Sequence, residues 1–455
     1  NFNGNGYNIA IGHNAGLSAT TGTDNTIIGG LAGDALTTGS LNVAIGKAAL
    51  SSEDTGSSNI AIGHAALMNQ NYDGSAYNVA VGHNAGTAVT TGDLNTIIGG
   101  LAGDALTTGD RNVALGYLAL STEDAGSRNV AIGAEALKSQ DGGSYNVAVG
   151  DSAAENLTTG GENTIIGGLA GDALTSGANN VAVGYLSLST EDGHGRNVAI
   201  GAYALKEQNA GAEAYNTAVG YQAGKEITTG TGNTLIGGFA GDAITTGTNN
   251  TAIGRSALTS EDGHGFNVAV GTFSLLNLNA GDNAFNTAVG YGSGENLTTG
   301  TSNSILGGQA GDALTTGSFN MAIGRNALTA ETGANRSTAI GYFALSSQNK
   351  GSGDANNIAI GHSAGQNVTT GIQNVIIGNN AGDALTTGGE NTVVGYFALT
   401  AEDEHGKNTA VGARALSAQN AGADAINTAV GYYAGLSMTT GVSNTILGGQ
   451  AGDAL

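Results

Sequence analysis

Pairs of adjacent acidic residues recur along the chain and are the residues best suited to bind a cation. Each pair is Glu followed by Asp, and clustered carboxylate oxygens are the ligands that calcium prefers. The pairs lack the Gly-Gly-x-Gly-x-Asp spacing of calcium-binding β-rolls, so we assign no metal ligand and keep calcium as the alternative to solvated or turn-capping carboxylates. The calcium candidates are Glu53, Asp54, Glu123, Asp124, Glu191 and Asp192.

Catalytic chemistry requires one constellation of residues gathered in a pocket. The chain contains no Cys, which excludes thiolate nucleophiles, thiolate metal ligands and disulfides. Its polar clusters are copied many times along the sequence, and no unrepeated set of Ser, His and Asp stands out. We therefore expect no catalytic residue, no cofactor and no enzymatic activity.

The charge balance limits the partners that this chain can bind. It has 36 acidic and 13 basic residues, for a formal net charge of -23, and such a chain repels phosphate backbones and anionic lipid. No apolar run approaches the roughly 20 residues that span a bilayer. Nucleic-acid binding and membrane insertion of this segment are therefore not expected.

An Asn-x-Ala-Ile-Gly pattern recurs from one end of the sequence to the other. Counting Ser337 in place of one Asn, there are 26 units, and a Gly stands four positions after the first residue in all of them. Within a group of four units the step is constant, as from Asn25 to Asn42, whereas the step between groups is usually two positions longer, as from Asn59 to Asn78. A second period of roughly 68 to 71 residues therefore lies over the first, as in a tandem array. The four-unit blocks start near residues 8, 78, 146, 216, 286, 357 and 427.

Each unit is interpreted as one coil of a parallel β-solenoid or β-roll, an all-β fold. Runs such as Val-Ala-Ile are short, β-rich and flanked by Gly and Asn, which is typical of strands. At ~3.3 Å per residue one unit traces a closed path of roughly 56 Å, enough for two short strands and two turns. About 26 coils of 17 residues would form a single continuous domain over residues 1–455, which we take as a segment of a longer fibre.

Three columns of side chains are expected to hold neighbouring coils together. The middle strand residue is Ala in 18 units and a larger aliphatic in eight, which suits a thin interior. The Asn column can form an amide ladder to the next coil or to its own turn. The Gly column ends the strand with a positive φ or a close approach between coils. The structural ladder consists of the Asn column, the Gly column and the third strand residue of each unit. It includes Asn8, Asn25, Asn42, Asn59, Gly12, Gly29, Gly46, Gly63, Ile11, Ile28, Ile45 and Ile62.

The third strand residue forms a second apolar column, because it is Ile, Val or Leu in every unit. Neighbouring strand residues point to opposite faces of a sheet, so this face also requires a cover. Left in water, it would be an apolar strip far larger than monomers expose. We expect a homo-oligomer, most simply a parallel homotrimer, with a wider coil of the single chain as the alternative cover.

Histidines recur at two positions of the repeat. One set follows the motif Gly, and the other lies in Glu-Asp-x-His corners. Equivalent histidines in successive blocks are four coils apart, about 19 Å, which is too far to share a metal within one chain. We interpret them as surface-turn residues, with metal binding or pH sensing across chains as the alternative. The sets are His13, His83 and His362, and His194, His264 and His405.

Aromatic and Thr columns suggest two kinds of binding surface. An aromatic residue precedes the first motif Asn of most blocks, where it either covers the edge of the roll or binds glycans. Thr-Thr-Gly recurs as in flat ice-binding arrays, but adjacent Thr side chains point to opposite faces, so each coil displays at most one. The aromatic row is Tyr7, Tyr77, Tyr145, Tyr215 and Phe285.

The repeat resembles sequences of known fibrous proteins. Asn42-Val-Ala-Ile-Gly46 and Asn129-Val-Ala-Ile-Gly133 resemble the repeated motif of trimeric autotransporter adhesin heads, although the coils here are longer. Asn250-Thr-Ala-Ile-Gly-Arg-Ser-Ala-Leu258 is similar to repeats in phage tail fibres. The similarity covers essentially the whole chain. It implies a left-handed, trimeric parallel β-roll that is displayed outside a cell or virion and used for attachment.

Together, these observations predict a structural and adhesive segment of an extracellular fibre, which works by rigidity and repeated display. The expected partners are copies of the chain itself, in a homo-oligomer or filament, and a host surface or glycan. The alternative is a β-solenoid binding module for calcium, glycan or ice.

Overall fold

The computed structural model describes residues 6–454, and the chain forms two compact units, Asn1–Thr231 and Gly232–Leu455. Both units are all-β, and no described residue lies in a helix. The strands of the first unit are β1 (Ile9–Ile11), β2 (Thr26–Ile28), β3 (Val43–Ile45), β4 (Ile60–Ile62), β5 (Val79–Val81), β6 (Thr96–Ile98), β7 (Val113–Leu115), β8 (Val130–Ile132), β9 (Val147–Val149), β10 (Thr164–Ile166), β11 (Val181–Val183), β12 (Val198–Ile200) and β13 (Thr217–Val219).

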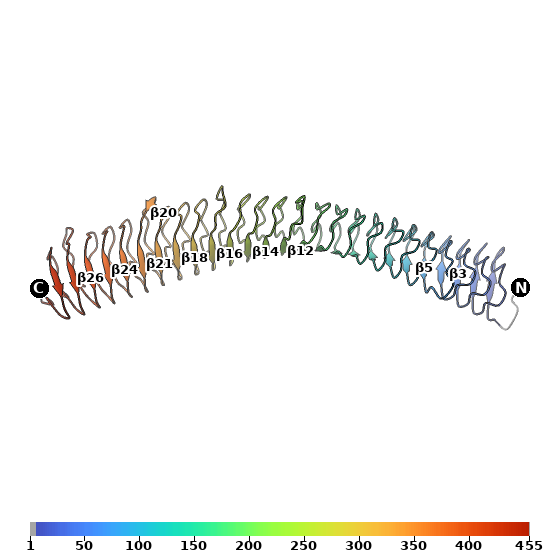
Figure 1. The fold of residues 1–455 in the computed structure, drawn as a ribbon, viewed down its shortest axis with the longest axis horizontal. Helices are drawn as coiled ribbons and strands as arrows, with labels where there is room; N and C mark the ends of the chain where they lie inside the picture. Colours follow the sequence, from blue (N-terminus) through green and yellow to red (C-terminus); the bar gives the residue numbers. More distant parts are fainter. Residues whose placement is uncertain (1–5, 455) are drawn as a thin grey trace. The chain divides into compact units, whose positions relative to one another are not determined.

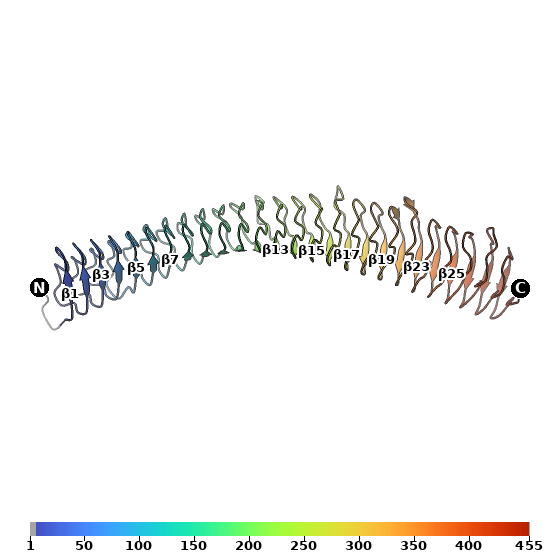
Figure 2. The same cartoon turned by 180° about the vertical axis from the view of Figure 1, so that it is seen from behind.

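The second unit repeats this arrangement. Its strands are β14 (Thr234–Ile236), β15 (Thr251–Ile253), β16 (Val268–Val270), β17 (Thr287–Val289), β18 (Ser304–Leu306), β19 (Met321–Ile323), β20 (Ala334–Asn335), β21 (Thr338–Ile340), β22 (Gly353–Asp354), β23 (Ile358–Ile360), β24 (Val375–Ile377), β25 (Thr392–Val394), β26 (Thr409–Val411), β27 (Thr428–Val430) and β28 (Thr445–Leu447). Figure 1 shows strands of this unit side by side in chain order, and Figure 2 shows those of the first unit from behind.

Neighbouring strands pair in parallel and in register, one coil apart. Val113 pairs with Val130, and Val130 pairs with Val147, so the chain returns to the same point of the coil once in each repeat unit. Each described Asn-x-Ala-Ile-Gly unit supplies one such strand. The predicted parallel β-solenoid of about 26 coils is therefore confirmed.

Each coil is long enough for two short strands, but most coils form only one. Almost every coil has a single three-residue strand, and its remaining residues form successive turns; β20 and β22 are a separate pair of two residues each. The turns need left-handed backbone even at non-glycine residues, such as Leu94 (φ 58°) and Leu101 (φ 56°). They still bond from coil to coil, as between the Leu120 N–H and the Ala136 carbonyl at 3.0 Å.

The interior residues differ from coil to coil within a block of four. In one kind of coil a large aliphatic residue on the strand and a second one in the turns face a Gly. In another kind the strand residue is Ala, the first turn position is a buried Leu, and the second turn position is polar. The residues are Ile97, Gly103 and Leu106 in one coil and Ala114, Leu120 and Glu123 in the next. In most blocks the first coil combines an Ala on the strand with a Gly in the turns, as at Ala80 and Gly86, and the Leu67 and Ile97 side chains of the neighbouring coils lie beside that Gly.

The amide ladder and the close glycine contacts are both present. The buried Asn112 side chain accepts a hydrogen bond from the Asn129 N–H of the next coil at 2.9 Å and donates one to the Gly126 carbonyl of its own coil at 2.9 Å. The motif Gly116 has φ +145°, and a Cβ there would overlap the Gly133 carbonyl group of the next coil. The expected roles of both columns are therefore confirmed.

The two faces of the strand differ in burial. The middle residues, such as Ala114 and Ala131, are fully buried, which confirms the predicted Ala-lined interior. The third residues point outward, and Leu115 and Ile200 remain 41% and 38% exposed. The alternative in which a wider coil of the same chain hides this face is wrong for the described residues.

Candidate functional site

The acidic pairs are divided between the interior and the surface. Glu53, Glu123 and Glu191 are fully buried, because they occupy the interior column that carries Leu106 in another coil. The Asp that follows each Glu stays at the surface, half-buried at Asp54 and exposed at positions 124 and 192. The interpretation of the Glu residues as solvated carboxylates is therefore wrong.

The buried Glu side chains cap the turn beneath them. The Glu53 carboxylate accepts hydrogen bonds from the Gly56 N–H at 2.6 Å and from the Tyr72 N–H of the next coil at 3.2 Å. Glu123 Oε1 accepts from the Ala125 and Gly142 N–H groups at 3.1 and 2.9 Å. The turn-capping alternative is thus confirmed for these residues, and the carboxylates link neighbouring coils.

Burial controls the ionisation of these groups. Desolvation raises the pKa of the Glu53 and Glu123 carboxyls above 4.5, and the backbone N–H donors oppose this shift only in part. The pKa of Glu191 is raised in the same way, although the neighbouring His194 favours its charged form. Removing a carboxylate from water disfavours its charge, so these side chains are a cost to the folded state once they ionise.

The raised pKa values predict a stability that falls as the pH rises. The folded state binds protons more tightly than the unfolded chain, so the stabilisation is complete below pH 4.5 and is lost as the pH rises through the folded pKa. We expect Glu53→Gln to lessen the fall of the unfolding temperature as the pH rises above 4.5, measured by circular dichroism. A pH slope equal to that of the wild type would contradict this assignment.

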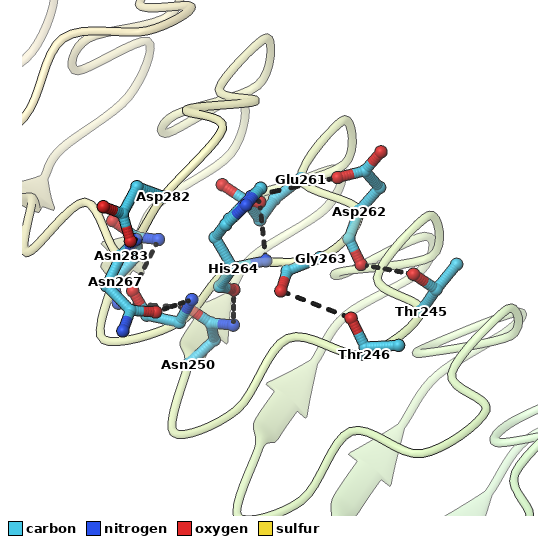
Figure 3. A network of polar contacts seen from close by, with 11 residues as sticks. Thr245, Thr246, Asn250, Glu261, Asp262, Gly263, His264, Asn267, Asp282 and Asn283 are labelled. Carbon is cyan, nitrogen blue, oxygen red and sulfur yellow. Dashed lines mark hydrogen bonds and ion pairs between the residues drawn. The ribbon is translucent and has the colours of Figure 1, made fainter.

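Each Glu-Asp-x-His corner brings its Glu and His side chains together. The Nδ1–Oε1 distance is 3.4 Å between His194 and Glu191, 3.1 Å between His264 and Glu261, and 3.5 Å in the third corner. Figure 3 shows His264 beside Glu261 and Asp262. The sequence predicts surface-turn residues at these positions, but the side chains are only 24–31% exposed and are therefore partly buried against the corner. The i,i+3 spacing onto an interior column was the signal for this contact.

A second histidine contact was missed from the sequence. The His64 and His83 rings stack with their centroids 5.2 Å apart. His64 also follows a motif Gly, and it lies in the coil immediately before His83. These two histidines are therefore one coil apart, whereas the equivalent histidines of successive blocks are four coils apart.

The predicted aromatic row lies on the surface. Tyr77, Tyr145 and Phe285 are 58%, 54% and 57% exposed. Some of these rings are stacked by a residue of the preceding coil: the Arg128 guanidinium lies 5.2 Å from the Tyr145 ring centroid, and the Phe266 ring lies 5.2 Å from that of Phe285. Such pre-ordered exposed rings are available to stack on a ligand.

In most Thr-Thr-Gly segments only the second Thr is exposed, as predicted, but Thr20 and Thr439, for example, are each exposed beside a second exposed Thr, so the limit of one displayed Thr per coil is wrong there. The first Thr is used within the solenoid: Thr37 Oγ1 donates to the Asp54 carbonyl and Thr107 Oγ1 to the Asp124 carbonyl, both at 2.9 Å. The second Thr of each segment, such as Thr108, is exposed.

Within residues 6–454, no helix has the length and apolar character needed to cross a membrane. No protein-family model matches this chain, and no curated protein matches it either.

Proposed function

We propose that this chain is a structural and adhesive segment of an extracellular fibre, and that it assembles as a parallel homotrimer through the outward face of its strands. The fibre acts by displaying the same surface turns repeatedly on a rigid support. The hydrogen-bonded ladder between coils supports this proposal, because it makes each unit a continuous stack rather than a pocket-bearing globule.

The outward face is the observation that carries the proposal. Within each unit the first and third strand residues are mostly Val, Ile, Leu or Thr, and they remain partly exposed. Complete burial of an Ile or Val contributes roughly 1.5–3 kcal/mol. Since the face recurs in every coil, the gain from covering it with a second and a third copy adds up along the stack.

We expect mass photometry of the chain to give three times the 44.4 kDa chain mass. Placing Lys on the outward face, in the double variant Leu115→Lys and Ile132→Lys, should shift the mass toward one chain, because charge is costly to bury in an apolar interface. The matched control places Lys at two exposed positions of the Thr-Thr-Gly segments, Thr108 and Thr159, and should leave the trimer intact. A double variant that stays trimeric would contradict the assigned interface.

A glycan-binding module is the alternative, and the exposed aromatic row favours it. The rings of Tyr77, Tyr145 and Tyr215 recur once per block and are each more than half exposed. A monomeric wild-type chain in the mass measurement would favour this alternative over the trimeric fibre.

A further inference from the structure

The three Glu-Asp-x-His corners combine ligand types that suit a small divalent cation. Each corner offers one imidazole nitrogen and two carboxylate groups, and the ligand atoms of each set lie within 4.8 Å of one another. We propose that each corner binds a divalent transition-metal ion of the zinc type through these three side chains. The corners are formed by residues 191, 192 and 194, by residues 261, 262 and 264, and by residues 402, 403 and 405.

The distances within a corner fit such an ion. His264 Nδ1 lies 3.1 Å from Glu261 Oε1 and 4.0 Å from Asp262 Oδ1, and Figure 3 shows the three side chains converging. Ligands held about 2.0–2.2 Å from a zinc-type ion are separated by roughly 3–4 Å. The ligand atoms of this corner therefore already lie near the separation that such an ion requires.

A buried oxygen without a partner points independently to a ligand. Glu191, Glu261 and Glu402 are fully buried, and among the described residues the Oε2 atom of each has no hydrogen-bond partner. The Nδ1 atoms of His194 and His405 also lack one. An unpaired buried carboxylate oxygen is destabilising, and a bound cation would remove that cost.

A Glu at this position of the coil does not always have an unpaired oxygen, as the equivalent Glu of another block shows. Glu331 has no His three residues later. Its Oε1 accepts from the N–H groups of residues 332, 333 and 334 at 2.8–3.0 Å. Its Oε2 accepts from Gln348 Nε2 at 3.0 Å and from the Lys350 N–H at 3.2 Å. Amides can therefore satisfy both oxygens at this position of the coil.

The cluster around Glu123 has carboxylates but no imidazole, so it shows whether the unpaired oxygen depends on a His. Glu123 Oε2 is also unpaired, and it lies beside the carboxylates of Asp124 and Asp141 but has no His with it. An unpaired Glu oxygen is therefore found where several acidic side chains lie close together, even without a His. The three corners with His add a nitrogen ligand to such a cluster.

The nitrogen ligand decides the class of ion. Calcium takes six to eight oxygen ligands, whereas imidazole with carboxylates suits zinc and its neighbours among the first-row metals. The His264 and Asp262 side chains are 26% and 55% exposed, so water can complete the coordination. Such a site has three protein ligands and an open position.

Titration of the full chain with ZnCl₂ in a calorimeter tests this inference. We expect three zinc ions per chain at these corners, and a loss of one ion in His264→Gln. Co²⁺ in place of zinc should give visible absorption bands that weaken by about one third in this variant, one site of three. Asp262→Asn removes an exposed ligand and should lower the affinity at one site without disturbing the interior.

The matched control is His362→Gln, because this exposed His follows a motif Gly and has no corner Glu beside it in sequence. It should leave the zinc stoichiometry unchanged. An unchanged stoichiometry in His264→Gln, or an absence of zinc binding to the wild type, would overturn the site and leave the corner as a His–Glu ion pair. Equally tight binding of CaCl₂ at the same corners would overturn the assigned metal class.

Discussion

Gly99→Ala is expected to destabilise the first unit by about 2–6 kcal/mol, the sum of backbone strain and overpacking. Gly99 has φ +140°, and a Cβ on it would overlap the Gly116 carbonyl oxygen and lie 2.7 Å from the carbonyl carbon. Both atoms belong to the backbone of the next coil, so the clash can be relieved only by separating two coils. Thermal unfolding by circular dichroism measures the effect, and hydrogen exchange should show the loss of protection centred on the coils around β6.

The neighbouring residue supplies the control for this prediction. A Cβ on Gly100 would meet only the Tyr117 side chain, at 3.8 Å, and Gly100 does not have a positive φ. The free energy of unfolding of Gly100→Ala should therefore lie within about 0.5 kcal/mol of the wild-type value, as it does for most surface substitutions. Equal effects of the two substitutions would show that coil-to-coil contact at the motif Gly does not limit the packing.

Asn357→Leu is expected to cost roughly 3–6 kcal/mol, because it leaves three buried polar groups without a partner. The Asn357 side chain accepts from the Asn374 N–H at 2.9 Å and donates to the Gly371 carbonyl at 2.7 Å and to Gln348 Oε1 at 2.9 Å. Leucine has a similar volume but none of these bonds. The unfolding temperature and the urea midpoint of the second unit should both fall.

Asn356→Leu is the matched control for the amide ladder. Asn356 is exposed and has φ 53°, and Leu41 and Leu94 occupy the same coil position with φ 62° and 58°. The same substitution one residue earlier should therefore be nearly neutral. If Asn357→Leu were as mild as Asn356→Leu, the amide ladder would contribute little to holding the coils together.

Much of the fold could be predicted because each coil position repeats its chemistry. The recurrence of Asn, Ala and Gly at fixed places defined the length of the coil, and alternation on the strand separated Ala114 inside from Leu115 outside. The number of strands could not be predicted in this way. Left-handed turn residues such as Leu101 give no signal of their own, since leucine is common in many local conformations.

The candidate site was predicted less well, because adjacent acidic residues suggest a surface. Aligning the coils would have shown that Glu123 stands one coil after Leu106 and one coil before Gln140. That column is interior, so the Glu must point inward and the Asp outward. The resulting contact between a buried Glu and His264 depends on this difference in direction, which composition and spacing alone do not reveal.

The distance between spin labels tests most directly whether each repeat unit is one coil. Thr91, Thr159 and Ser176 are exposed, equivalent positions in the first unit, and the chain has no native Cys to interfere with labelling. Nitroxides on Cys residues at positions 91 and 159, four coils apart, should be about 19 Å apart, and those at 91 and 176 about 24 Å, at ~4.8 Å per coil. Distances that do not increase by one strand spacing for each repeat unit would contradict the solenoid, and with it the proposed fibre.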